Sequence, residues 1–135
     1  MINANIEEYL DESQLKAIED FRVLVNEVGL PSEVIASEKT SILNTYNKCL
    51  LNLQNILYYL DQNVRFSTLE MNEIKAEALQ DQLNDGRSAT AASQLTYLDS
   101  RLIDSIDHVN KLEGIKNLIW SYATQCTNVI KLYQK

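Results

Sequence analysis

Turn-forming residues are scarce in this chain of 135 residues, which contains three glycines and one proline. Because glycine and proline most often interrupt regular structure, few turns are expected and each element must be long. The two cysteines, Cys49 and Cys126, have no nearby cysteine partner in the sequence, and a single histidine, His108, leaves too few ligands for a zinc site. A disulfide-rich scaffold and the common zinc folds are therefore excluded.

Motifs of catalysis are also missing. The chain has no glycine-rich phosphate loop and no nucleophile elbow, and neither cysteine has a histidine at helical spacing. Asp104, Asp107 and His108 form the only group of metal-like ligands that shares a helical face. Di-metal helical bundles need two histidines and four carboxylates, so we interpret this group as a solvated polar face. No enzyme activity, cofactor or metal is predicted.

Long apolar runs are absent as well. Residues 1–5 carry no basic segment ahead of an apolar one, which argues against a secretory signal. The most apolar stretch, residues 50–60, is interrupted by Asn52, Gln54 and Asn55, so no membrane span is predicted. We expect a cytoplasmic protein without a membrane partner.

What the sequence does have is a heptad pattern, in which apolar residues recur at alternating steps of three and four. This heptad seam predicts two long helices that pack on each other. Its members are Leu43, Tyr46, Leu50, Leu53, Leu57, Leu60, Val64, Met71, Ile74 and Ala78 in the first half and Leu95, Leu98, Leu102, Val109, Leu112, Ile119, Ala123, Cys126, Ile130 and Tyr133 in the second, interrupted by Ser105 and Lys116. The predicted fold is all-α, a long antiparallel helical hairpin resembling a coiled coil, with a shorter N-terminal amphipathic helix.

The expected boundaries within one domain of residues 1–135 follow from caps and breakers. An acidic helical segment covers 1–30, and Asp11 to Gln14 forms a capping box within it. Pro31 and Ser32 start a long helix over 32–84, and Gly86 supplies the turn before a long C-terminal helix over 88–134. Residues 61–68 contain weak helix formers and mark the place where the first long helix would kink or break.

The net charge of −7 is confined to the N-terminal region. Residues 1–38 hold nine acids and two bases, whereas residues 39–135 hold ten of each. Such an acidic helix can dock on a basic protein by charge complementarity. The candidate partner-binding residues are Glu7, Glu8, Asp11, Glu12, Glu19 and Asp20.

Aromatic and basic residues gather near the C-terminus, a combination that binds single-stranded nucleic acid because lysines attract phosphates and aromatic rings stack on bases. The candidates there are Lys116, Trp120, Lys131 and Lys135, accompanied by Tyr122 and Tyr133. Arg87 at the turn is a further candidate phosphate contact. The competing interpretation is burial, because Tyr133 lies on the seam and Ile119 flanks Trp120.

The C-terminal region resembles the last helix of the phage recombination mediator family typified by UvsY. The likeness covers about the last forty residues, through Leu98-Asp99, Leu102-Ile103, Ile106-Asp107, Leu112 and the terminal run 128–131. The resemblance implies a ring of identical subunits that binds single-stranded DNA and helps a RecA-like recombinase to load, without catalysis. By position in the family pattern, Lys75 and Arg87 take the strand-binding role.

Two functions therefore stay open. The first is a non-catalytic, oligomeric phage-type recombination mediator that binds single-stranded DNA and a recombinase in the host cytoplasm. The second is a structural or interaction protein, a virion component or host-directed inhibitor, which acts through its acidic N-terminal helix without binding nucleic acid. Both include a homo-oligomer, because a two-helix rod leaves apolar residues beside the seam that further helices must cover. These residues are Ile56, Ile103, Ile106, Leu118 and Val129.

Overall fold

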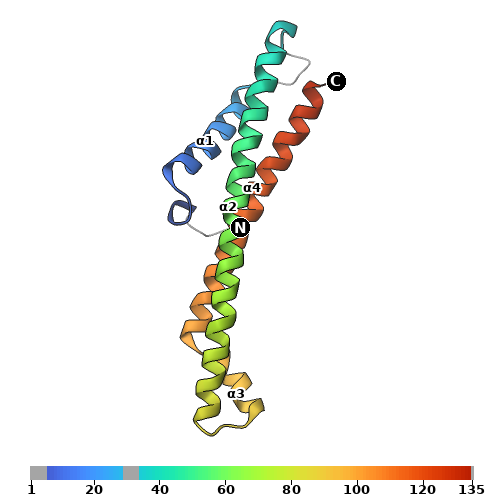
Figure 1. Cartoon of the computed structure of the whole chain (residues 1–135). Coiled ribbons are helices and arrows are strands. Elements are labelled where there is room, and N and C mark those ends of the chain that lie inside the picture. Colours follow the sequence, from blue (N-terminus) through green and yellow to red (C-terminus); the bar gives the residue numbers. More distant parts are fainter. Residues whose placement is uncertain (1–5, 29–33, 135) are drawn as a thin grey trace.

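The computed structural model describes residues 6–28 and 34–134, in which all regular structure is helical. The order is a 3-10 turn η1 (Ile6–Glu8), α1 (Glu12–Glu27), α2 (Ala36–Asn84), α3 (Ala89–Thr96) and α4 (Ser100–Tyr133). Figure 1 shows α2 and α4 side by side along an elongated molecule, with α1 beside one half of α2 and α3 at the opposite end. The predicted all-α hairpin with a shorter N-terminal helix is confirmed. Pro31 and Ser32 lie outside the described residues, but Val34 and Ile35 are not helical and α2 begins at Ala36, so the helix predicted over 32–84 starts later than predicted.

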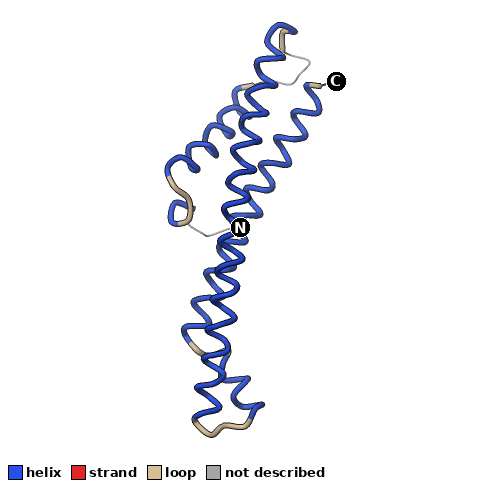
Figure 2. Tube along the Cα trace, in the orientation of Figure 1, coloured by secondary structure: helices blue, strands red, loops and turns tan. Residues whose placement is uncertain are grey.

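The core of the hairpin lies between α2 and α4, where the heptad seam predicted it. Leu53 and Leu60 from α2 and Ile119 from α4 have no exposed surface. The other seam residues classed as buried are Tyr46, Ala78, Leu102, Val109, Leu112, Ala123, Cys126, Ile130 and Tyr133. At 49 residues, α2 is about 70 Å long, because a helix rises about 1.5 Å per residue. The hairpin is therefore a rod, and Figure 2 shows that helix makes up nearly all of it.

The first long helix runs without interruption through residues 61–68. Thr68 donates its hydroxyl to the carbonyl oxygen of Val64 at 2.7 Å, and Arg65 forms an ion pair with Asp61 one turn earlier at 3.1 Å. These contacts within the helix, together with the buried apolar residues on either side, outweigh the weak propensities of the segment. The break predicted at residues 61–68 is therefore not found.

The second arm is two helices, so the single helix predicted over 88–134 is wrong. The chain leaves α3 after Thr96 and begins α4 at Ser100. Asp99 caps α4 by accepting a hydrogen bond from the backbone N–H of Arg101 at 2.9 Å, and the Arg101 side chain in turn binds Asp81 on α2 at 3.0 Å. Leu98, a predicted seam residue, is 71% exposed because it lies in this break.

The caps at the other helix ends follow the sequence signals. Asp11 accepts from the backbone N–H of Gln14 at 2.8 Å, and the Gln14 side chain accepts from the N–H of Asp11, so the predicted capping box is confirmed. Ser88 caps α3 by accepting from the N–H of Ala91. Gly86 has a φ of +85°, which most residues with a side chain avoid.

Cys49 and Cys126 are both buried free thiols within the core between α2 and α4. The Cys126 thiol donates to the carbonyl oxygen of Tyr46 at 3.1 Å. Burial, aided by the nearby Cys49, raises the pKa of Cys126 to about 11, and burial also raises the pKa of Cys49. Both sulfurs are therefore protonated at neutral pH and act as small apolar groups.

A Gly86→Ala substitution should destabilise the protein by about 1 kcal/mol, the usual cost of forcing a residue with a Cβ into a left-handed conformation. An added Cβ would meet no atom within 4 Å, so the loss reflects the backbone alone. Urea denaturation followed by circular dichroism measures it. Gly86→Asn is the matched control and should lose less, because asparagine tolerates this conformation. Equal stability of all three proteins would contradict the prediction.

Candidate functional site

The helix α1 is fixed to the rod by one side and leaves the other side in solvent. Ile18 and Phe21 are buried, and the Phe21 ring lies 5.5 Å from the ring of Tyr122 on α4. Arg22 donates to the Tyr122 hydroxyl at 2.8 Å and also lies over its ring. Tyr122 thus serves as the docking point of α1. No sequence pattern predicts this contact, since Arg22 and Tyr122 are 100 positions apart.

The covering of Ile56 also depends on α1. Ile56 was expected to need helices from another subunit, but it is 3% exposed and belongs to the same core as Ile18 and Phe21 of α1. Among the other apolar residues beside the seam, Ile106, Leu118 and Val129 are half-buried within the single chain, and Ile103 is exposed.

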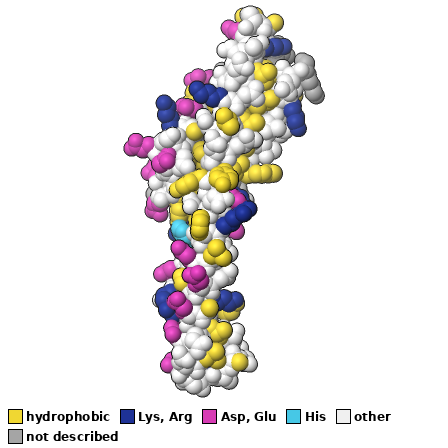
Figure 3. Space-filling model, viewed as in Figure 1, with side chains coloured by type: hydrophobic (Ala, Val, Ile, Leu, Met, Phe, Trp, Pro, Cys, Tyr) yellow, Lys and Arg dark blue, Asp and Glu magenta, His cyan; other side chains and the backbone are white. Residues whose placement is uncertain are grey.

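The candidate acidic residues differ in whether they already make contacts within the chain. Glu8, Glu12, Glu19 and Asp20 are exposed, whereas Asp11 is engaged in the capping box. Glu7 is exposed and already takes part in an interaction. In Figure 3 acidic side chains gather on the side of the molecule where Figure 1 places α1. We call the exposed acids of α1, Glu12, Glu19, Asp20 and Glu27, the acidic face.

The ion pairs among the described residues lie elsewhere. They are Arg65–Asp61, Arg87–Asp85, Arg101–Asp81, Arg101–Asp99, Lys111–Asp107 and Lys116–Asp61, with N–O distances of 2.9 to 3.1 Å. All of them join residues of α2, α4 and the two loops beside α3. None includes a carboxylate of the acidic face, although the charge excess of the chain is concentrated in its N-terminal region.

The predicted strand-binding residues do not converge on one surface. The ammonium of Lys75 lies 4.9 Å from the ring centre of Tyr97, and Arg87 is held by Asp85 at the turn. Lys116 donates to Asp61 in the middle of the rod. Lys131 is exposed near the far end of α4, about 22 Å of helix from Lys116. Lys135 lies outside the described residues.

Trp120 is the exception to the burial of aromatic residues on α4. Its side chain is 63% exposed, whereas Tyr133 is buried and packs against Tyr46 at 6.0 Å between ring centres. Lys131 follows Trp120 by eleven residues, which is about three helical turns, so the two lie on the same side of α4. Of the residues predicted to form a nucleic-acid site on α4, Trp120 and Lys131 are exposed on the same side of the helix.

Two residues of the group Asp104, Asp107 and His108 contact side chains outside the group. Asp107 forms an ion pair with Lys111 at 2.9 Å, and the His108 ring lies 5.6 Å from the ring of Tyr9. Over residues 6–28 and 34–134, no set of three histidine, cysteine or acidic residues is placed to hold a metal ion. The same ranges contain no helix long and apolar enough to cross a membrane.

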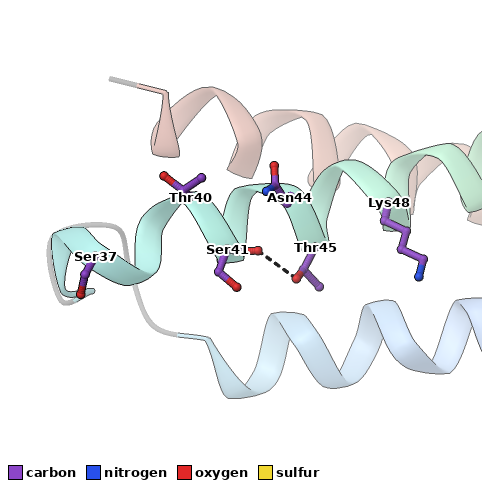
Figure 4. A pocket seen from close by; sticks show the side chains of 6 residues that line it. All are labelled: Ser37, Thr40, Ser41, Asn44, Thr45 and Lys48. Atoms are coloured by element: carbon purple, nitrogen blue, oxygen red, sulfur yellow. Dashed lines mark hydrogen bonds between the residues drawn. The ribbon is translucent and has the colours of Figure 1, made fainter.

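A shallow polar groove lies at the start of α2, with a volume of about 650 Å³. It is lined by Ser37, Thr40, Ser41, Asn44, Thr45 and Lys48, whose side chains spread along the first turns of the helix (Figure 4). The Thr45 hydroxyl donates to the carbonyl oxygen of Ser41 at 3.0 Å. The lining residues include no acid or imidazole that could activate a hydroxyl, and Lys48 is the one ionisable side chain among them.

Comparison with known proteins gives no relative for this chain: no family model matches it, and no curated protein or solved structure resembles it significantly. The likeness to the UvsY-type mediators therefore stays a prediction that rests on the C-terminal residues.

The ion pair of Lys116 with Asp61 should make stability depend on pH. The hydrogen bond from Lys116 holds the pKa of Asp61 below its ordinary value, with Arg65 adding to the effect. The stabilisation is complete above the unfolded-state pKa of about 3.9 and is lost as the pH falls through the lower folded-state pKa. Asp61→Asn should therefore lower the Tm at pH 7 but not at about pH 2.

Thermal unfolding of the variant and the native chain at several pH values tests this. The control is Asp104→Asn, because Asp104 is exposed and makes no ion pair among the described residues. A Tm difference for Asp61→Asn that is the same at both pH values would refute the assignment.

Proposed function

We propose that this protein is a non-catalytic interaction protein that uses the acidic face of α1 to bind a basic protein partner. The observation that carries the proposal is that the ion pairs of the described chain leave Glu12, Glu19, Asp20 and Glu27 unneutralised. Elsewhere the chain pairs many of its charges internally. Lys16 is exposed among these four acids, so the acidic face carries three net negative charges. Such an excess on a fixed helix attracts an oppositely charged surface and speeds its association.

The packing of α1 suits this role. Because Phe21 and Arg22 both contact Tyr122, the helix is held in one orientation and its acids are presented together. A preorganised surface loses less conformational entropy on binding than a mobile segment does. The hairpin thus acts as the support and α1 as the recognition element, in a virion component or a host-directed inhibitor.

A second candidate function is the phage-type mediator that binds single-stranded DNA and a recombinase. It is favoured by one observation, the exposed Trp120 on the same side of α4 as Lys131. An exposed ring can stack on a base while the lysine contacts a phosphate. Against it, Lys75, Lys116 and Arg87 are occupied by contacts within the chain.

Neutralising the acidic face should abolish partner binding without unfolding the protein. The variant is Glu12→Gln, Glu19→Gln and Glu27→Gln in the full chain, because these side chains are exposed. Proteins retained by the immobilised native chain at low salt and released at high salt are identified and compared between variants. We expect the variant to lose the basic proteins among them. Deleting residues 1–38 is a poorer test, since it would uncover the core beneath Ile18 and Phe21.

The matched control removes three acids from the rod, as Glu77→Gln, Asp104→Asn and Glu113→Gln. Its net charge equals that of the first variant, so only the position of the acids differs. Retention that falls equally in both variants would show a general charge effect and would overturn the proposal.

Strand binding is tested directly, because Trp120 is the only tryptophan of the chain. On the first proposal, a single-stranded oligothymidine leaves the tryptophan fluorescence unchanged at low and at moderate salt. Quenching that weakens steeply with salt would instead establish the mediator function. In that case Trp120→Ala should cost about 1–3 kcal/mol of binding free energy, and Lys131→Ala should reduce the salt slope by about one.

A further inference from the structure

The helix α2 has a second apolar surface on the side turned away from α4. Leu51, Tyr58, Phe66 and Leu69 are between 57% and 69% exposed. Leu51 and Leu69 are eighteen residues apart, which is five helical turns, so they lie on one line along the helix, and Tyr58 falls close to that line. The buried residues Leu53 and Leu60 lie on the opposite side. We call the four exposed residues the outer face.

The outer face is large for a protein surface that contacts only water. A fully exposed aromatic side chain presents about 150–250 Å², so the four residues together expose on the order of 500 Å². Asn55 and Gln62 separate these side chains along the helix, so they form a row of apolar contacts and not one continuous patch. Apolar surface of this size on soluble proteins commonly marks interaction sites. Figure 3 shows hydrophobic side chains gathered near the middle of the molecule.

We propose that a second copy of this chain covers the outer face, with the two α2 helices antiparallel around a two-fold axis at the height of Leu60. The inference concerns assembly and holds whichever ligand the acidic face binds. A two-fold interface must be complementary to itself, because the same patch is used by both copies. The spacing of the outer face meets this condition: Leu51 lies opposite the partner subunit's Leu69, and Leu69 opposite the partner subunit's Leu51.

Charges beside the outer face select the antiparallel arrangement. Lys48 and Glu73 flank it on the same side of α2, are exposed, and form no ion pair within the described chain. The register that pairs Leu51 with Leu69 also brings Lys48 within one residue of the partner subunit's Glu73, twice in the dimer. In a parallel pair the two copies of Lys48 would lie on opposite sides of the interface and far along the helix from either Glu73, so no opposite charges would meet.

The buried area is enough for a specific dimer. Two outer faces would bury on the order of 1,000 Å² of apolar surface, near the lower limit for biological interfaces. Flanking polar residues such as Gln62 and Arg65 would add to it. We therefore expect a dimer whose population rises with protein concentration over the range used in solution.

Sedimentation equilibrium of the full chain over a range of concentrations tests the proposal. The expected mass rises towards twice the 15.4 kDa of one chain. Leu69→Glu should keep it at one chain throughout, since it places a charge against the partner subunit's Leu51 at both ends of the interface. The control is Leu98→Glu, which makes the same change at an exposed leucine outside the outer face and should leave the dimer intact. Circular dichroism confirms that both variants keep their helix content.

Charge exchange tests the orientation. Lys48→Glu and Glu73→Lys should each weaken the dimer at low salt, and the double variant should restore it, because the two charges meet only in the antiparallel pair. A native chain that stays monomeric at every concentration would overturn the proposal. So would an assembly that persists in Leu69→Glu, which must use another surface, or a double variant that is not restored.

Discussion

Burial of one face of α2 against α4 is the constraint on which the rest of the structure depends. Leu53, Leu60, Ile115 and Ile119 lose all contact with water in this seam, and no other pair of helices shares so much surface. A helix of this length has little stability in water by itself, since most helical stability comes from packing. The seam also sets Tyr122 and Ile56 where α1 can pack on both.

A second feature of the molecule is the distribution of its paired and unpaired charges. Five cations of the rod are paired with nearby carboxylates. Among them, Lys116 occupies a position of the apolar seam and donates to Asp61 at 2.9 Å. The helix α1 differs because its cation Arg22 contacts Tyr122 while its four acids and Lys16 stay exposed. Its net charge of −2 falls on 16 residues, whereas the same net charge is spread over all of residues 36–134, so negative charge is concentrated on α1.

The sequence was informative where a rule is local and poor where exposure depends on distant contacts. Heptad spacing, the Asp11 capping box and Gly86 were enough to predict the hairpin and its turn. The break at residues 97–99 was not predicted because no proline or glycine marks it. It is stabilised by a hydrogen bond from Arg101 to Asp81, twenty residues away in the sequence. Trp120 beside a core position was equally compatible with burial and exposure. The outer face was not predicted because the heptad pattern describes only the side of the helix that packs on its partner.

The turn at Gly86 has a consequence for the order in which the chain folds. Contacts beside it join residues close in sequence, such as Asp81 and Arg101, whereas Tyr46 and Cys126 at the far end are eighty residues apart. Closing a short loop costs less entropy than closing a long one, and each formed contact shortens the next loop. We therefore expect the hairpin to form from the turn towards its open end, and α1, which contacts Tyr122 in the half far from the turn, to dock last.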